Sequence, residues 1–403
     1  MKNKNFLLVI SKFPPEYAGP GVRIPRLYKW LKEERDEINI QILCNGIEKV
    51  KNEKYVYEGY SVRRVTAEYL NKLSFIPQKI LNALVYQYEF LKTLFLLFFS
   101  KHYRNIHFLH IAGHSGGTAA ALVWSRIRHV PVLMELVTEH AKHEQSFLFF
   151  FKVGISNNAA LITLTDQARK NCLNLSVKES QIWCRPNPIN ESVFYPEFQK
   201  KYELRKKLTS FDESKKTIVN VAKMIPQKNQ FLILKILKLL PEDYTAVIAG
   251  PFVKEGPLYK RDREYVESMK KFIKQNNLSA RVNLVLDFVN AEEYMKLGDV
   301  YVMPAWNEGF GTPMMEAMAC GVPVVANSQE IAFQEWIEGG KNGYLCDIQE
   351  PEEWAQAIQK VVKFSEEKCL EMAERIREKA GQKAIYSHYE DIIDSLLSGD
   401  CKS

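Results

Sequence analysis

The sequence predicts an α/β protein built from two Rossmann-like domains that face each other across a cleft. Short apolar runs alternate with helical patterns through most of the chain, which is typical of parallel sheets covered by helices on both faces. A segment rich in turn formers near residue 190 interrupts this alternation, and a second alternating series follows it. Open parallel sheets bind ligands beyond the carboxyl ends of their strands, so two facing sheets would share one ligand cleft.

The strands are expected where the apolar runs are continuous. In the first half these runs are residues 6–10, 38–43, 106–110, 130–136 and 160–165. In the second half they are residues 217–222, 244–249, 281–286, 299–304 and 322–326. The turn formers of Arg185-Pro-Asn-Pro-Ile-Asn190 and a solvated helix at 200–208 separate the two series.

The composition excludes several classes of protein. The chain has 403 residues, 46% hydrophobic and 26% charged, so wholesale disorder, collagen and coiled coil are excluded. Seven scattered cysteines with no C-x-x-C sequence argue against a disulfide framework or a structural zinc site and favour a reducing compartment. We therefore expect a cytoplasmic protein.

The net charge and the apolar segments indicate which kinds of binding partner the protein could have. Residues 6–10 are too short for the core of a signal peptide, and no cleavage site follows them. Residues 80–99 are interrupted by Gln87, Glu89 and Lys92 and make a poor membrane span. The net charge of +7 is mild and suits an anionic small ligand, an anionic membrane surface or nucleic acid. Of these we predict the small ligand and the membrane surface, and no nucleic acid.

The most informative segment is 299–326. A strand leads into the loop Ala305-Trp-Asn-Glu-Gly-Phe-Gly-Thr312, and Pro313 fits the first position of the helix that follows. This order offers backbone N–H groups, here those of Phe310, Gly311 and Thr312, and a helix N-terminus to a phosphate.

Two glutamates frame this loop, Glu308 and Glu316. Glu316 is expected in the first turn of the helix, where its carboxylate could accept two hydrogen bonds from the diol of a ribose. The alternative is that Glu316 only complements the helix dipole.

A second segment, Val221-Ala-Lys-Met-Ile-Pro-Gln-Lys-Asn229, follows a strand and carries Lys223 and Lys228 where a diphosphate would lie. Alone, the pair fits solvated surface charge better than a ligand site. Gly250 ends the next strand and would allow a ligand to approach closely.

These segments resemble the retaining GT-B glycosyltransferases of family 4. The stretch Glu308-Gly-Phe-Gly-Thr-Pro-Met-Met-Glu316-Ala-Met-Ala-Cys-Gly-Val-Pro-Val-Val325 is similar to the family's signature. The 221–229 stretch resembles a V-G-R…K-G motif, with Lys223, Ala222 and Asn229 where the family usually has arginine, glycine and glycine. Further similarity lies in Asn187-Pro-Ile-Asn190 and in Gly339-Gly-Lys-Asn-Gly-Tyr-Leu345. The resemblance covers about residues 185–360, and the N-terminal half matches only in outline.

The resemblance implies a role for each matched residue. Lys223 and Lys228 would contact the donor diphosphate, and Glu316 the ribose. Glu308 would face the sugar hydroxyls. The nucleobase would meet a backbone segment that ends at Val289. The list of donor-binding residues is completed by Gly250 and by the loop residues Gly309, Phe310, Gly311 and Thr312.

The same resemblance implies the domain organisation. Residues 1–190 would form an acceptor-side domain and residues 191–385 a nucleotide-sugar domain. Residues 386–403 would form a helix that crosses back to the first domain.

The N-terminal half has its own candidates. Gly19 and Gly21 resemble a glycine pair near the acceptor and the donor phosphates, although an ordinary tight turn is the alternative. A histidine near the reacting sugar is implied after the strand at 106–110, and His110 and His114 both fit. A metal site built from His107, His110 and His114 is not predicted, because no acidic residue accompanies them at ligand spacing.

The aromatic stretch 81–99, together with 147–151, has two interpretations. It is a buried helix with an apolar lid patch, or it is a surface for a membrane or a lipid-linked acceptor. Lys92, Lys101 and Arg104 flank it, as cations flank interfacial elements.

The sequence therefore predicts a retaining glycosyltransferase that uses a nucleotide diphosphate sugar, a glycan or lipid-linked acceptor and no cofactor. Glu308, Lys228 and one of the two histidines, His110 or His114, are the expected catalytic residues. No D-x-D sequence occurs, so we expect lysines and backbone dipoles in place of a bridging metal. One alternative is an inactive, glycan-binding relative. The other is a nicotinamide-dependent oxidoreductase, but this sequence lacks the glycine fingerprint that such an enzyme needs.

Overall fold

The computed structural model describes residues 4–14, 19–35, 37–46, 53–66, 76–136, 158–212, 214–252 and 259–399. The chain divides into two compact units. The N-terminal unit contains Met1–Arg185 and Ile385–Ser403, and the C-terminal unit contains Pro186–Ala384. The break thus follows Arg185, five residues before the predicted boundary at 190.

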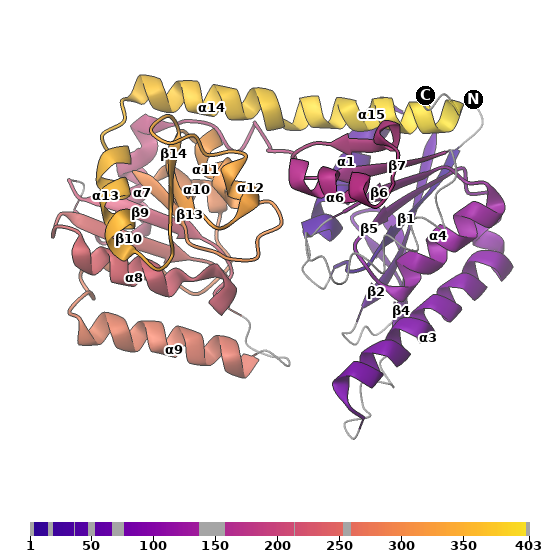
Figure 1. The fold of residues 1–403 in the computed structure, drawn as a ribbon, viewed down its shortest axis with the longest axis horizontal. Helices are drawn as coiled ribbons and strands as arrows, with labels where there is room; N and C mark the ends of the chain where they lie inside the picture. The colour runs from indigo at the N-terminus through magenta and orange to yellow at the C-terminus, as the bar shows by residue number, and fades with distance from the viewer. Residues whose placement is uncertain are drawn as a thin grey trace. The chain divides into compact units, whose positions relative to one another are not determined.

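The N-terminal unit is an eight-stranded sheet with strand order β3-β4-β2-β1-β5-β6-β7-β8 (Figure 1). All of its neighbouring strands are parallel except the β3–β4 hairpin. Its elements are β1 (Lys4–Ile10), α1 (Gly19–Glu34), β2 (Ile38–Gly46), β3 (Lys54–Tyr57), β4 (Tyr60–Thr66), α3 (Gln78–Phe99), β5 (Phe108–Ala112), α4 (Gly116–Arg128), β6 (Val132–Glu135), β7 (Ala159–Thr163), α6 (Asp166–Asn174), β8 (Ile182–Cys184) and most of α15 (Gln382–Ser398).

The C-terminal unit is a six-stranded, wholly parallel sheet with strand order β11-β10-β9-β12-β13-β14. Its elements are α7 (Lys201–Leu208), β9 (Lys216–Val221), α8 (Gln230–Leu239), β10 (Tyr244–Ala249), α9 (Tyr259–Gln275), β11 (Val282–Val285), α10 (Ala291–Lys296), β12 (Val300–Met303), α11 (Thr312–Ala319), β13 (Val324–Asn327), α12 (Ile331–Gln334), β14 (Gly343–Cys346), α13 (Pro351–Val361) and α14 (Glu366–Ala380).

Both units therefore have the predicted fold class, a parallel sheet with helices on its faces. Four strands escaped prediction: β3, β4, β8 and β14. Three of them end a sheet, where one flank is open and an unbroken apolar run is not needed. β3, for example, alternates exposed and half-buried residues. It joins β4 through Glu58 and Gly59, which both have positive φ angles, as hairpin turns require.

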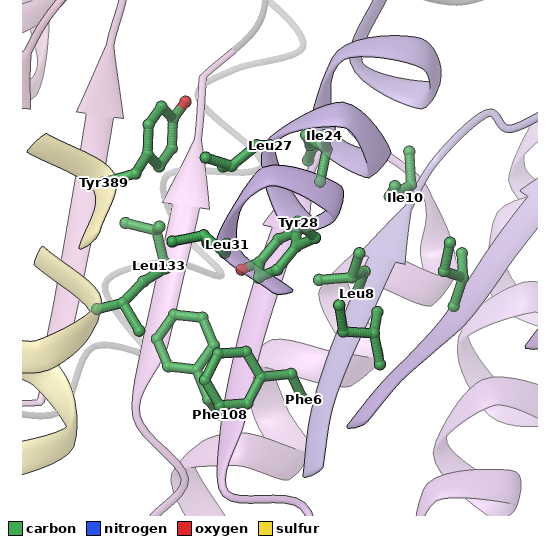
Figure 2. Close-up of a cluster of buried hydrophobic side chains, with 14 of the residues drawn as sticks. Phe6, Leu8, Ile10, Ile24, Leu27, Tyr28, Leu31, Phe108, Leu133 and Tyr389 are labelled. Carbon is green, nitrogen blue, oxygen red and sulfur yellow. The ribbon is translucent and has the colours of Figure 1, made fainter. Parts of the chain in front are cut away.

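Two hydrophobic clusters cover the faces of the N-terminal sheet. One joins β1 and β5 to α1 and α15, and Figure 2 shows Phe6, Leu8 and Phe108 of the strands beside Tyr28 of α1. The other joins the opposite face to α3 and α4. The last helix, α15, is therefore part of the core of the N-terminal unit, although the chain passes through the whole C-terminal unit before it.

A buried polar cluster centred on Glu135 lies beside this core. The Glu135 carboxylate, at the end of β6, accepts hydrogen bonds from Arg23 of α1 (Nη1, 3.2 Å), His110 of β5 (Nε2, 3.2 Å) and the Tyr389 hydroxyl of α15. Burial alone would raise the pKa of Glu135, but the charge of Arg23 and the hydrogen bond from His110 hold it well below its usual value. The Glu135 carboxylate of β6 is thus hydrogen-bonded to three other elements, α1, β5 and α15.

We predict that Glu135→Gln destabilises the N-terminal unit by about 3–5 kcal/mol at neutral pH, because it leaves the Arg23 guanidinium buried without its counter-charge. Because the folded-state pKa of Glu135 is depressed, this stabilisation is present above the ordinary carboxyl pKa of about 4.3 and is lost as the pH falls below it. Calorimetry of the wild type and the variant at pH 7 measures the difference.

The matched control is Glu390→Gln, which removes a partly exposed partner of Arg35 and should change the stability by at most about 1 kcal/mol. Equal effects of the two substitutions would contradict the central place of Glu135.

Candidate functional site

The loop after β12 has the geometry expected of an anion-binding turn. Gly311 caps α11 with φ +79°, and a Cβ atom there would lie 2.6 Å from the Phe333 ring. Only glycine fits a left-handed conformation with so little space. The helix begins at Thr312, so Pro313 occupies its second position rather than the predicted first. Gly309 and Thr312 are half-exposed, whereas Phe310 is buried.

The earlier helix start corrects the expectation for Glu316. With Thr312 as the first residue of α11, no acidic residue lies in the first turn, and Glu316 falls in the second. Its side chain is half-buried. The Tyr301 hydroxyl donates a hydrogen bond to the Val221 carbonyl (3.1 Å). Burial raises the pKa of Tyr301, and the charge of Glu316 raises it further. Glu316 is thus close to the end of β9.

A glutamate that sequence reasoning missed fixes the loop backbone. Glu330 accepts hydrogen bonds from the backbone N–H groups of Asn307 (2.8 Å) and Glu308 (2.9 Å). The Asn327 amide donates to the Ala305 carbonyl (3.0 Å) from a fully buried position. These contacts span about twenty residues of sequence, and no local motif signals them.

The second predicted segment, 221–229, packs against this loop. The Gln227 amide donates to the Asn307 carbonyl (2.8 Å), and the Trp306 N–H donates to the Gln227 carbonyl (3.1 Å). Asn229 has a left-handed conformation, φ +52°, where the resembled family carries glycine. Asparagine tolerates this region better than most residues, so the replacement preserves the turn. The Asn229 amide also bonds the Pro304 carbonyl (3.2 Å).

Lys228 and Glu308, which the sequence places 80 residues apart, form an ion pair. Both side chains are mostly buried, with 19% and 13% of their surface exposed. Burial lowers the pKa of Lys228 to about 8. Lys223, in contrast, is exposed, and its backbone carbonyl accepts a hydrogen bond from the Gln230 amide (2.9 Å). The structure brings Lys228, but not the ammonium of Lys223, into contact with Glu308.

The remaining predicted donor residues lie at the same edge of the sheet. Gly250, at the end of β10, has φ +151°, and a Cβ atom there would lie 2.0 Å from the Ala222 carbonyl oxygen. Val289, half-exposed, follows β11. Because β11, β10, β9 and β12 are neighbours and parallel, their carboxyl ends place these residues and the Glu308 loop in one row.

Asn187, one of the turn formers between the two series of strands, also contacts this loop. Its amide nitrogen donates to the Thr312 hydroxyl (3.0 Å), and its amide oxygen is buried without a hydrogen-bond partner.

The N-terminal candidates are placed differently from the prediction. Gly19 and Gly21 begin helix α1 rather than occupying a loop, and residues 15–18 of the predicted loop lie outside the described part. Gly19 has open space where a side chain would be, whereas a Cβ atom on Gly21 would lie 2.8 Å from the Lys12 carbonyl oxygen. Of the pair, only Gly21 is required by packing.

The two candidate histidines have different surroundings. His110 is 1% exposed, and its ring nitrogens contact the Tyr28 hydroxyl (2.9 Å) and Glu135 (3.2 Å). His110 is therefore held in the core, and the expectation that it faces a ligand does not fit its burial. His114 is exposed, with its ring 5.5 Å from that of Tyr86. Within the described ranges, no group of three His, Cys, Asp or Glu side chains could hold a metal ion.

Comparison with known proteins gives consistent matches. The sequence model of the family described as glycosyl transferases group 1 matches residues 201–383. N-acetyl-alpha-D-glucosaminyl L-malate synthase of Bacillus anthracis is 24% identical over 396 residues, which cover 96% of either chain.

Solved structures show the same fold over the whole chain. A sucrose-phosphate synthase of Thermosynechococcus elongatus superposes with a TM-score of 0.75 and 17% identity, covering 98% of this chain and 99% of that one. Anabaena HepE, solved in complex with UDP and glucose, gives a TM-score of 0.69 and 17% identity, covering 97% and 100%. At these identities the two structures establish the fold, the two-domain GT-B architecture.

We predict that Gly311→Ala destabilises the C-terminal unit by about 1–3 kcal/mol, because it forces a side chain into a left-handed conformation against Phe333. Calorimetry provides the measurement. Gly339→Ala is the matched control, since a Cβ atom there meets nothing within 4 Å. A loss no larger in Gly311→Ala than in Gly339→Ala would contradict the strained cap.

Proposed function

We propose that this chain transfers a sugar from a nucleotide diphosphate sugar, because residues 201–383 match the family model described as glycosyl transferases group 1. The acceptor would be a hydroxyl of a glycan or of a lipid-linked molecule, in the synthesis of a cell-surface polysaccharide or glycoconjugate. The observation that carries the proposal is the Lys228–Glu308 ion pair, which lies beside a glycine loop and a helix N-terminus at the carboxyl edge of a parallel sheet.

The donor class follows from the charges at this edge. Lys228 and the start of α11, whose N-cap Gly311 makes no side-chain cap hydrogen bond, suit a diphosphate. Glu316, close to the end of β9, is suited to accept hydrogen bonds from a ribose diol. The UDP and glucose in the HepE structure support a donor of this class.

The ion pair also supplies the groups for the chemistry. When a donor binds, the Lys228 ammonium would turn to the diphosphate, and the Glu308 carboxylate would accept hydrogen bonds from the sugar hydroxyls. The buried ammonium would stabilise the negative charge that grows on the diphosphate as the glycosidic bond breaks. We therefore propose that no bridging metal is needed.

We propose a front-face displacement with retention of configuration. The acceptor oxygen forms its bond to the anomeric carbon on the face from which the diphosphate departs. The bond between that carbon and the phosphate oxygen breaks, and the departing phosphate takes the acceptor proton. Of the two candidate histidines, exposed His114 is the one that we place near the sugar.

The lowered pKa of Lys228 predicts a pH-dependent affinity. A diphosphate binds the charged ammonium, so the affinity should fall as the pH rises from 7 through about 8. Between pH 7 and pH 9 we expect the dissociation constant of the tightest nucleoside diphosphate among UDP, GDP and ADP to rise up to about tenfold. Isothermal titration calorimetry measures this change.

The control is Lys228→Arg, whose guanidinium stays charged throughout this range. Its affinity should be independent of pH even if it is weaker overall. The same pH dependence in both proteins would exclude Lys228 as its source.

Product stereochemistry tests the mechanism. With an α-linked nucleotide sugar and a hydroxyl acceptor, the first-formed product should be α-linked, as its anomeric proton coupling in NMR would show. A β product would exclude retention while leaving the transferase assignment intact. Nucleotide binding without any turnover would instead identify an inactive relative.

Two variants examined in the same assay separate the roles of the glutamates. Glu308→Gln should lower turnover while nucleoside diphosphate affinity is kept, since it weakens the sugar contact and frees Lys228. Glu316→Gln should weaken nucleotide binding itself, because the ribose loses a charged acceptor. The reverse pattern would contradict the assignment of the two carboxylates.

A further inference from the structure

Helix α3 exposes a stripe of apolar side chains, which exposed Gln87 interrupts between Leu84 and Leu91. Its inner side contributes Leu96 and Leu97 to the core and packs against α4, beside which it lies in Figure 1. On its outer side Leu91, Phe95 and Phe99 expose 64%, 61% and 68% of their surface. The rings of Phe95 and Phe99 are 4.8 Å apart. Ile80 and Leu84 extend the stripe toward the helix N-terminus. Single exposed apolar residues are ordinary, but a contiguous row marks an interaction surface.

A cationic cavity of about 290 Å³ lies at the end of this helix. It is lined by β2, β3, β4 and the short 3-10 helix η1 (Lys101–Tyr103) that follows α3. Lys54, Arg63 and His102 contribute to its wall, and none of its lining residues, all in the described part of the chain, is acidic. The Nε atom of Arg63 is buried without a hydrogen-bond partner. The cavity is therefore suited to an anion such as a phosphate group.

Helix α3 and the cavity are adjacent. Lys54 pairs with Arg63 in the β3–β4 hairpin, and the alternation of the strand puts Arg63 on the same face as Val65. Val65 packs in the cluster that contains Leu96 and Leu97 of α3. Lys92 of α3 pairs with Glu53 (2.7 Å), which immediately precedes β3. The cavity thus occupies the part of this sheet face that α3 leaves uncovered, next to its last turn.

We propose that the stripe and the cavity together bind the surface of an anionic phospholipid bilayer. Leu91, Phe95 and Phe99 would enter the boundary between headgroups and acyl chains, while Lys54 and Arg63 would hold a headgroup phosphate. Charge complementarity favours this partner over a second copy of the chain, which would bring the same cations together. Exposed Lys101 and Arg104 add further positive charge beside Phe99.

The helix would lie on the bilayer rather than cross it. Among the described helices, none has both the length and the apolar character needed for a membrane span. Within α3 itself, Glu89 and Thr93 are buried on the protein side. The second aromatic segment of the sequence prediction, residues 147–151, lies outside the described residues. This proposal is independent of the donor chemistry proposed above.

Co-sedimentation with vesicles tests the proposal on the full chain. Vesicles of phosphatidylcholine with about one-third phosphatidylglycerol should retain the wild type at low salt, and rising salt should release it. Phe95→Ser with Phe99→Ser should lower the partition coefficient about tenfold or more. Lys54→Glu with Arg63→Glu should lower it at least about fivefold for each charge. Phosphatidylcholine alone should retain little protein.

Matched controls lie on the other unit. Leu370→Ser removes an exposed leucine from α14, and Lys271→Glu with Lys274→Glu reverses two exposed charges on α9. These variants should bind vesicles like the wild type, and all variants should keep the wild-type nucleotide affinity and melting temperature.

Three results would overturn the proposal. One is wild-type protein that stays in the supernatant at low salt. Another is vesicle binding unchanged in the stripe or the cavity variants. The third is a lipid-free dimer that Phe95→Ser with Phe99→Ser dissociates, since the stripe would then be an interface between two copies. Loss of nucleotide binding in every variant would count against the proposed function and would leave the membrane proposal unaffected.

Discussion

The ion pair between Lys228 and Glu308 is the contact on which the arrangement of the candidate site depends. It joins loops that follow β9 and β12, neighbouring parallel strands whose ends the sheet places at one edge. A mostly buried charge without a partner is costly, so each group requires the other while no ligand is bound. Glu330 and Gln227 hold the backbone of the Glu308 loop where the carboxylate meets the ammonium. The structure thus holds together the cation and the carboxylate that the proposed donor would use separately.

Much of the sheet could be predicted because the central strands of a parallel sheet are buried on both faces and read as unbroken apolar runs. β10 has the predicted bounds, and β1 and β9 differ from them by one or two residues. Edge strands lack this signal. β14, for example, was not predicted as a strand, and only its two ends are fully buried. The residues of the candidate site likewise divide into those with a local sequence signal and those without one. Loops with local signatures, such as 308–312, were found, whereas the hydrogen bonds from Glu330 to Asn307 and Glu308 depend on the tertiary fold and leave no local pattern.

His110 shows how a chemically suggestive residue can serve the core instead. Every residue of β5 is buried, His110 included. Its neighbours Tyr28 and Glu135 come from α1 and β6, so neither partner is near it in sequence. The hydroxyl of Tyr28 can donate to Nδ1 while Nε2–H donates to Glu135, which satisfies both nitrogens of a neutral ring. The sequence alone could not separate His110 from His114, because the difference lies in these distant partners.

Helix α3 presents the same problem on a larger scale. Its composition supported two interpretations, a buried helix and an interfacial one, and averaging over the helix cannot distinguish them because its two sides differ. Leu96 and Leu97 pack in the core. Leu91, Phe95 and Phe99 instead expose apolar surface to water, and core packing does not account for these three residues. Apolar surface by itself would favour any apolar partner. The cations of the adjoining cavity restrict that choice, since an anionic partner offers them counter-charge and a like-charged copy of the chain does not. A bilayer carrying anionic headgroups meets both requirements at once, with one surface.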